Sequence, residues 1–163
     1  TEDGATEQEV LDILWKTGRD NSRTPMQWNT SDNAGFTNGK PWLKINDNFK
    51  KINVENQEND PNSILSYYKK MIELRKANEP LVYAPYELID VDSEPVYAYT
   101  RKGKKEAFLI ITNLSSEGQK FVLSKEIVKM DAELCLSNID VNDHQLVEKM
   151  EFTPYEARVY RLK

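Results

Sequence analysis

The sequence predicts a mainly β protein, in which an antiparallel β-sandwich over residues 81–163 follows a segment of helices and loops. From residue 81 onwards, apolar and polar residues alternate in short runs, which is typical of half-buried strands. Turn-forming residues separate these runs at close intervals, which favours antiparallel connections. Before residue 81 the strongest pattern is helical, over residues 62–78. We therefore place a domain boundary near residue 80.

The first expected element is a short helix over residues 5–17. Thr6 is a suitable N-cap, and Glu9 follows three residues later, as in a capping box. Apolar residues then recur at helical spacing, and Gly18 is expected to end the helix.

The loop that follows, over residues 18–40, is the most informative part of the sequence. It holds Arg19 and Arg23, four residues apart, and it is too rich in polar and turn-forming residues for a core strand or an ordinary helix. Loops of this kind commonly carry function on a rigid scaffold. A short extended piece and an Asn- and charge-rich stretch without a core-forming pattern come next, over residues 41–46 and 47–60.

The strongest predicted helix covers residues 62–78. Asp60 or Asn62 is expected to cap its start. Its apolar residues trace one face, and Asn78 and Pro80 are expected to stop it. Beyond it we expect six or seven short strands that form the antiparallel sandwich. The candidate strands are 86–91, 96–101, 106–112, 119–123, 132–137, 146–151 and 155–162.

Composition excludes several classes of protein. The net charge of −5 argues against nucleic acid as the main partner, because phosphate binding needs a basic surface. No apolar run is long enough to cross a bilayer, and the polar, acidic N-terminus does not resemble a signal peptide. The single cysteine, Cys135, rules out an internal disulfide framework and is expected to be a small buried hydrophobe. These features favour a cytoplasmic protein without a membrane partner.

Residues 1–60 combine many large aromatic side chains with little regular structure. Such side chains need a surface against which to be buried. The chain also has no initiator Met, so we interpret it as a piece of a longer protein from which a larger body is missing. Without that body, residues 1–60 are expected to be mobile or to self-associate with another copy of the chain.

Several strings in this region and beyond it resemble one enzyme family. RDNSRTPMQW, NAGF, PWLKIN and NSILSYYKKMIELRK occur in the order found in the α-glucosidase branch of the α-amylase superfamily, which includes oligo-1,6-glucosidase, dextran glucosidase and trehalose-6-phosphate hydrolase. The closing YEARVY, preceded by Pro154, resembles the end of that family's C-terminal domain. The resemblance covers essentially the whole chain.

The resemblance implies a (β/α)₈ barrel followed by a β-sandwich, domain C. Residues 1–80 are then the tail of the catalytic barrel: a loop excursion after the eighth strand, followed by the eighth helix over residues 62–78. Residues 81–163 are the C-terminal β-sandwich domain. Because barrel active sites lie at the C-terminal ends of the strands, the loop with the arginines is expected at the mouth of the active site.

The resemblance also implies a retaining mechanism, in which a nucleophilic carboxylate and an acid/base carboxylate lie about 5 Å apart. Both come from barrel strands that precede this sequence in the family, so no catalytic residue is expected here and the chain alone is expected to be inactive. No cofactor or metal is implied. The one histidine, His144, is expected to be a solvated loop residue.

What the chain is expected to supply is contact with an oligosaccharide substrate. In the family, an arginine of this motif pairs with a barrel aspartate and holds the non-reducing glucose, for which the planar guanidinium fork is well suited. Arg23 is the first candidate and Arg19 the second. The alternative is that one or both form ordinary interdomain ion pairs. Asp20 is expected to bond the local backbone, and residues 26–28 to fix the loop by packing, with sugar stacking on Trp28 as the alternative.

Other polar or aromatic groups have two interpretations each. Two groups of carboxylates are expected to lie in turns and to be solvated: those of residues 55, 58 and 60, and those of residues 90, 92 and 94. For the second group, the alternative is a calcium site. Tyr83, Tyr86, Tyr97 and Tyr99 are expected to pack in a core or interface rather than form a sugar platform.

Three functions therefore stay open. The first is the C-terminal part of an α-glucosidase acting on α-1,6 or related bonds. The second is a non-catalytic structural or weak carbohydrate-binding module. The third is a catalytically dead transport-accessory homologue. The sequence does not determine which glycosidic linkage is cut. It also does not distinguish an engineered piece from a proteolytic product or the product of a truncated gene.

Overall fold

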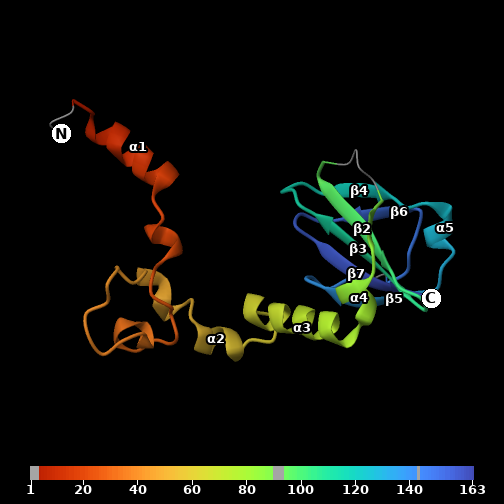
Figure 1. Cartoon of the computed structure of the whole chain (residues 1–163), viewed down its shortest axis with the longest axis horizontal. Coiled ribbons are helices and arrows are strands. Elements are labelled where there is room, and N and C mark those ends of the chain that lie inside the picture. Colours follow the sequence, from red (N-terminus) through yellow and green to blue (C-terminus); the bar gives the residue numbers. More distant parts are fainter. Residues whose placement is uncertain (1–3, 90–93, 143) are drawn as a thin grey trace. The chain divides into compact units, whose positions relative to one another are not determined.

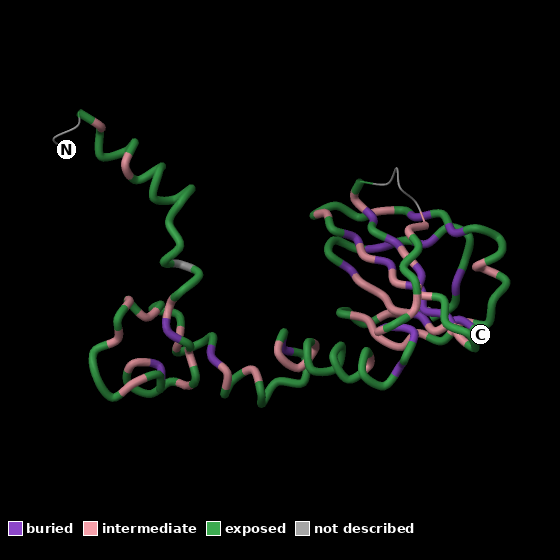
Figure 2. The backbone as a smooth tube through the Cα atoms, in the orientation of Figure 1, coloured by how far each residue is buried: buried purple, intermediate pink, exposed green. Residues whose placement is uncertain are grey.

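The computed structural model describes residues 4–89, 94–142 and 144–163. The chain divides into two compact units, of which the first ends at Ser66 and the second begins at Tyr67. Figure 2 shows that buried residues are concentrated in the second unit.

The first unit consists of short helices and long connections. It contains α1 (Glu7–Thr17), the 3₁₀ turns η1 (Asp20–Ser22), η2 (Asp32–Gly35) and η3 (Asp47–Lys50), and α2 (Val54–Glu58). The predicted capping box of α1 is confirmed: Glu9 N donates to Thr6 Oγ1 at 3.3 Å, and Thr6 N donates to Glu9 Oε2 at 2.8 Å. These bonds satisfy two free N–H groups of the first turn. No residue of α1 is buried.

The long helix α3 (Ile64–Ala77) begins later than predicted, and neither Asp60 nor Asn62 caps it. Ser66 N donates to Ser63 Oγ at 3.1 Å, which is the N-cap pattern. The Asp60 carboxylate instead accepts from Asn62 N at 2.8 Å and so shapes the turn before the helix.

A short helix, α4 (Glu79–Tyr83), follows α3 and was not predicted. Pro80 ends the helix predicted over residues 62–78, but proline also suits the first turn of a new helix. The side chain of Asn78 connects the two helices to the rest of the unit. Its Nδ2 donates to Leu74 O at 2.6 Å, and its Oδ1 accepts from Arg161 Nη2 at 2.9 Å.

The second unit contains two antiparallel sheets, shown in Figure 1. The larger sheet has the strand order β1-β2-β3-β7-β5 and the smaller one pairs β4 with β6. A further short helix, α5 (Lys125–Val128), precedes β5 and was not predicted. The strands are β1 (Tyr86–Leu88), β2 (Val96–Lys102), β3 (Ala107–Asn113), β4 (Gln119–Val122), β5 (Ala132–Ser137), β6 (Lys149–Phe152) and β7 (Ala157–Leu162).

The prediction of a mainly β, antiparallel fold is therefore confirmed, and a strand occurs in each of the seven predicted places. The described strands do not close into a barrel. One core joins the two sheets, because its buried side chains come from both. They include Val96, Leu109, Ile111, Tyr160 and Leu162 from the larger sheet, and Phe121, Met150 and Phe152 from the smaller one.

Two strands differ from prediction for local reasons. β6 begins at Lys149 although the pattern predicted a start at residue 146, because Leu146 is buried in the core from an irregular segment. In β5 the register against β7 shifts between Leu134 and Leu136. Cys135 lies at this bulge and is half-buried rather than a core residue, contrary to prediction. Burial nevertheless raises the pKa of its thiol.

Within the described ranges, no helix has the length and apolar character needed to cross a bilayer. The same residues contain no cluster of His, Cys, Asp or Glu side chains that is suited to a metal ion.

Candidate functional site

The two candidate arginines flank a single 3₁₀ turn, η1, in the first unit. Ser22 fixes the start of the turn, because its N and Oγ donate to Arg19 O at 3.2 and 2.8 Å. Arg23 N donates to Asp20 O at 3.0 Å and closes the end of the turn. Asp20 takes part in this turn through its backbone carbonyl oxygen, so the expected bond of its carboxylate to the local backbone stays a prediction. The backbone positions of Arg19 and Arg23 are set by these bonds.

Both arginine side chains are exposed. Among the residues that the structure describes, neither guanidinium forms an ion pair or a side-chain hydrogen bond. A guanidinium is a fork of donors that matches a carboxylate or a pair of hydroxyls. Within the described residues the two arginines therefore remain available to such a group, and the alternative of an interdomain ion pair stays open.

The loop is held by amide hydrogen bonds more than by the packing predicted for residues 26–28. Met26 and Trp28 are about half exposed, at 49% and 48%. Between them, Gln27 Nε2 donates to Ile52 O at 2.5 Å and to Asn48 Oδ1 at 3.2 Å. The backbone adds two bonds, from residue 54 to Gln27 O and from residue 55 to Trp28 O, each at 3.0 Å. Residues 27–28 are thus attached to the segment 48–55.

The NAGF string forms a tight left-handed turn that closes the same loop. Asn33, Ala34 and Gly35 have φ values of 51°, 55° and 67° in succession. The turn directs Ala34 O back to accept from Trp28 N at 2.9 Å. Asn33 Nδ2 donates to the carbonyl oxygens of residues 37 and 39, each at 3.1 Å. Asparagine and glycine tolerate this backbone region best, which accounts for Asn33 and Gly35, whereas Ala34 adopts it at a steric cost.

Asn53 is the anchor that sequence reasoning missed. It is 2% exposed, its Oδ1 accepts from Asn56 N at 2.8 Å and its Nδ2 donates to Phe49 O at 2.8 Å. It therefore caps α2 and fixes the segment that holds Gln27. The stretch 47–60 has no core-forming pattern in the sequence, and its density of asparagines is the one signal that points to such an anchor.

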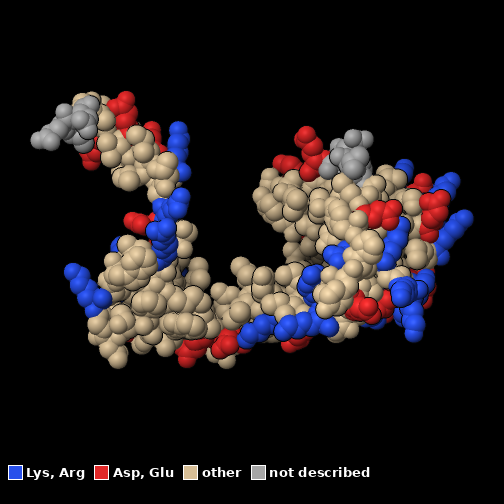
Figure 3. Space-filling model, in the orientation of Figure 1, with Lys and Arg blue, Asp and Glu red and all other residues tan. Residues whose placement is uncertain are grey.

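The charges around the loop limit the chemistry that the described residues can offer. Figure 3 shows that much of the visible surface of the loop region carries neither basic nor acidic side chains. Glu55 and Asp60 are exposed, as expected for solvated carboxylates. The described residues bring no pair of buried carboxylates to the arginines, so the loop offers hydrogen-bond donors but no acid/base pair.

The remaining candidates lie outside this loop. Tyr86, Tyr97 and Tyr99 form an exposed or half-exposed cluster on β1 and β2, so they do not belong to the core between the sheets. The Tyr86 and Tyr97 hydroxyls are 2.6 Å apart, and this bond raises the pKa of Tyr86 to about 12. Tyr83 is 80% exposed. His144 is exposed, with Nε2 2.8 Å from the carbonyl oxygen of residue 141.

The carboxylate group considered as an alternative calcium site is only partly described. Its members at positions 90 and 92 lie outside the described residues, and Glu94 is exposed.

Comparison with known protein families matches two parts of the chain to two α-amylase domains. Residues 1–84 match the family described as "Alpha amylase, catalytic domain", and residues 96–159 match "Alpha-amylase SusG C-terminal domain". The chain is 44% identical over 160 residues to the oligo-1,6-glucosidase of Parageobacillus thermoglucosidasius, covering 98% of this chain and 28% of that protein. It is 36% identical over 163 residues to the trehalose-6-phosphate hydrolase of Bacillus subtilis, covering 99% of this chain and 29% of that protein.

Solved structures show the same correspondence. The trehalose-6-phosphate hydrolase of Bacillus licheniformis is 42% identical with a TM-score of 0.88, covering 99% of this chain and 29% of that chain. The trehalulose synthase of Pseudomonas mesoacidophila MX-45 is 36% identical with a TM-score of 0.89, covering 100% of this chain and 29% of that chain. The chain thus spans less than a third of the length of these relatives.

Proposed function

The chain belongs to the α-amylase family, and we propose that it is the C-terminal part of a retaining α-glucosidase that hydrolyses α-1,6 or related bonds of short oligosaccharides. The observation that carries this proposal is the 44% identity to an oligo-1,6-glucosidase, which extends over 98% of the chain. Relatives named for glucan 1,6-α-glucosidase and trehalose-6-phosphate hydrolase activity match to a similar extent.

In this proposal, residues 1–80 are the tail of the catalytic barrel and residues 81–163 are the C-terminal β-sandwich domain. The helix predicted over residues 62–78 is the eighth barrel helix. The first unit supports this assignment because its apolar side chains have no covering surface: Trp15 is 80% exposed and Ile64 is 81% exposed. Side chains of this size are normally buried against a further layer.

Arg23, with Arg19 as second candidate, binds the non-reducing glucose of the substrate in this proposal. Exposed guanidinium groups without an ion-pair partner in the described residues, on a backbone fixed by η1, are suited to this task. The catalytic carboxylates belong to the barrel, so this chain alone is inactive. A cytoplasmic location is supported by the single cysteine, which excludes an internal disulfide.

A chimera tests the proposal directly. This chain replaces the matching C-terminal segment of the Parageobacillus thermoglucosidasius oligo-1,6-glucosidase, and hydrolysis of isomaltose and p-nitrophenyl α-glucoside is measured. We expect turnover by the chimera and none by the 163-residue chain alone. A chimera that folds, as judged by its thermal unfolding, but does not hydrolyse either substrate would overturn the proposal.

A further inference from the structure

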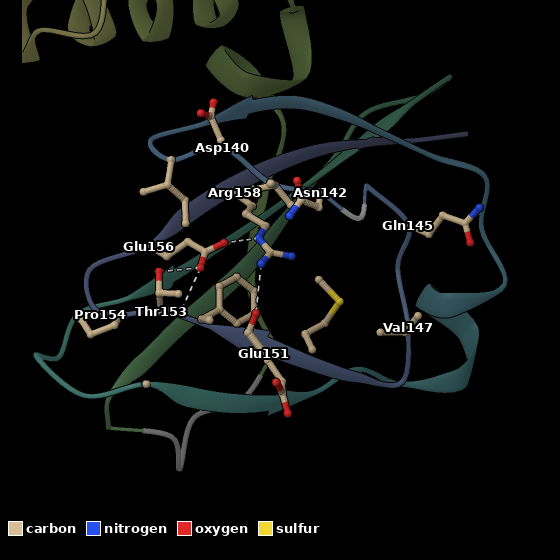
Figure 4. A pocket seen from close by; sticks show the side chains of 14 residues that line it. Asp140, Asn142, Gln145, Val147, Glu151, Thr153, Pro154, Glu156 and Arg158 are labelled. Atoms are coloured by element: carbon tan, nitrogen blue, oxygen red, sulfur yellow. Dashed lines mark hydrogen bonds and ion pairs between the residues drawn. The ribbon is translucent and has the colours of Figure 1, made fainter.

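A cavity of about 560 Å³ opens in the second unit, beside β6 and β7. Its walls come from residues 139–142, residues 145 and 147, and the two strands with the turn between them (Figure 4). Pockets that bind small molecules in proteins have volumes of roughly 300–1,000 Å³. The cavity therefore has the size of a ligand site, and it lies outside the loop that carries Arg19 and Arg23.

A largely buried arginine, Arg158, forms the polar centre of this cavity (Figure 4). Arg158 Nε lies 2.5 Å from Glu156 Oε1, Nη2 donates to Glu151 O at 3.0 Å, and Nη1 donates to the Tyr160 hydroxyl at 3.4 Å. A guanidinium has five N–H groups, so these contacts leave two without an acceptor among the described residues. The Arg158 side chain is 12% exposed, and it lines the cavity. A ligand oxygen that reaches this guanidinium would therefore find donors on a group whose position is already fixed by these three contacts.

Apolar surface surrounds this polar centre. The Phe152 ring lies under the guanidinium, 4.6 Å from Arg158 Cζ to the ring centroid, and Met150 adds a second buried apolar side chain. At the rim, Ile139 and Val147 are 39% and 42% exposed. The cavity thus presents C–H groups around a small number of fixed polar atoms, as binding pockets for small molecules do.

The charges restrict the class of ligand. An anion is disfavoured, because the Arg158 charge is already balanced by Glu156 and the further carboxylates of Asp140 and Glu151 belong to the lining residues. A metal cation is disfavoured, because the described residues contain no cluster of His, Cys, Asp or Glu side chains that is suited to hold one. A neutral ligand that offers both hydroxyl groups and C–H faces satisfies the site.

We propose that this cavity is a non-catalytic binding site for a neutral hexose unit of an oligosaccharide. The choice of a sugar among neutral polyhydroxylated ligands rests on the proposed function. Ring hydroxyls accept from the two unused N–H groups of Arg158, and the C–H face of the ring contacts Val147 and Ile139. Such a site holds a glucan without reacting with it.

Isothermal titration calorimetry of the 163-residue chain with isomaltose and with maltotriose tests this inference. We expect saturable binding with a dissociation constant near or below ~10 mM. Val147→Trp fills the rim and is expected to weaken binding about tenfold or more. Val122→Trp is the matched control, because Val122 is 62% exposed on β4 and does not line the cavity. If Val147→Trp does not unfold cooperatively, and is therefore not properly folded, Ile139→Trp takes its place.

The outcomes separate this inference from the proposed function. No saturable heat up to about 50 mM sugar, or equal binding by the Val147→Trp and Val122→Trp variants, would overturn it. Binding that is lost in Arg23→Ala would place the sugar on the first unit and would also overturn it. Binding that persists in Arg23→Ala and is lost in Val147→Trp supports the cavity, even if the chimera proves inactive.

Discussion

Glu156 and Arg158 form a buried ion pair at the start of β7, with Glu156 Oε1 and Arg158 Nε 2.5 Å apart. The Glu156 side chain is 1% exposed, and its second oxygen accepts from Thr153 N at 2.7 Å and from Thr153 Oγ1 at 2.9 Å. The pair therefore joins the turn between β6 and β7 to the core. A buried pair of this kind is sensitive to the loss of either partner, because the remaining charge stays uncompensated.

Replacement of Glu156 by glutamine is expected to destabilise the second unit by about 3 kcal/mol, because it leaves the Arg158 charge buried without a counterion. Urea unfolding followed by circular dichroism measures the change. Glu151→Gln is the control: its ion pair with Lys120 is solvent-exposed, so the expected cost is below about 1 kcal/mol. Equal effects of the two substitutions would contradict the importance of the buried pair.

The same carboxylate makes stability depend on pH. Burial by itself raises the pKa of Glu156, but the hydrogen bonds from Arg158 and Thr153 outweigh burial and hold this pKa below its ordinary value of 4.5. A lowered folded-state pKa contributes stability that is complete above the unfolded-state value and is lost as the pH falls through the folded-state value. The free energy of unfolding should therefore decline below about pH 4.5 more steeply in the unchanged protein than in Glu156→Gln. Parallel curves for the two proteins would refute this assignment.

The strands were predictable because period-two alternation and turn residues are local signals. All seven appear where expected. β6 starts late because Leu146 joins the core from outside the strand, and the last two residues predicted for the first strand, 90 and 91, lie outside the described residues. The short helices α2, α4 and α5 were missed because four or five residues carry too little periodicity. Pro80 shows the ambiguity, since the same residue ends one helix and begins the next.

The site was only partly predictable. Arg19 and Arg23 stand out by their spacing, but the bonds that fix their loop connect residues far apart in the sequence. Gln27 reaches residues 48 and 52, and no periodic pattern reports such contacts. The tyrosines show the same limit: Tyr97 and Tyr99 share a strand face by alternation, whereas the contact with Tyr86 depends on the register of β1 against β2.

Gly35→Ala is expected to loosen the arginine loop. Gly35 has a φ of +67°, and a Cβ atom there would lie 2.6 Å from Asn29 Oδ1. The substitution should cost about 1 kcal/mol or more, because both the backbone and the contact resist it. Hydrogen exchange at the amides of residues 28 and 29, which donate to Ala34 O, measures the loss as faster exchange. Gly39→Ala is the matched control, since its nearest contact is 3.8 Å away, and unchanged exchange in both variants would contradict the argument.

Self-association through residues 1–60 is also testable. On α1, Leu14 is 57% exposed and Trp15 is 80% exposed, so these side chains gain from burial against another copy. Sedimentation velocity of the chain should show an increase in mass with concentration, and Leu14→Asp should reduce it. Lys16→Asp changes charge on the same helix and serves as the control. A monomer at every concentration, with residues 1–60 protected from proteolysis, would rule out both self-association and mobility.

Arg23→Ala in the active chimera is expected to lower kcat/KM for isomaltose by about tenfold to a hundredfold, because it removes charge-assisted hydrogen bonds to the substrate. Arg19→Ala should have the smaller effect, because Arg23 is the first candidate for the glucose contact. Arg23→Lys keeps the charge but loses the planar fork, so it should restore only part of the activity. Thermal unfolding shows whether each variant remains folded, since η1 is held by backbone bonds that these substitutions leave in place. Full activity of Arg23→Ala would remove this residue from the substrate site, and a larger loss in Arg19→Ala would transfer the role to Arg19.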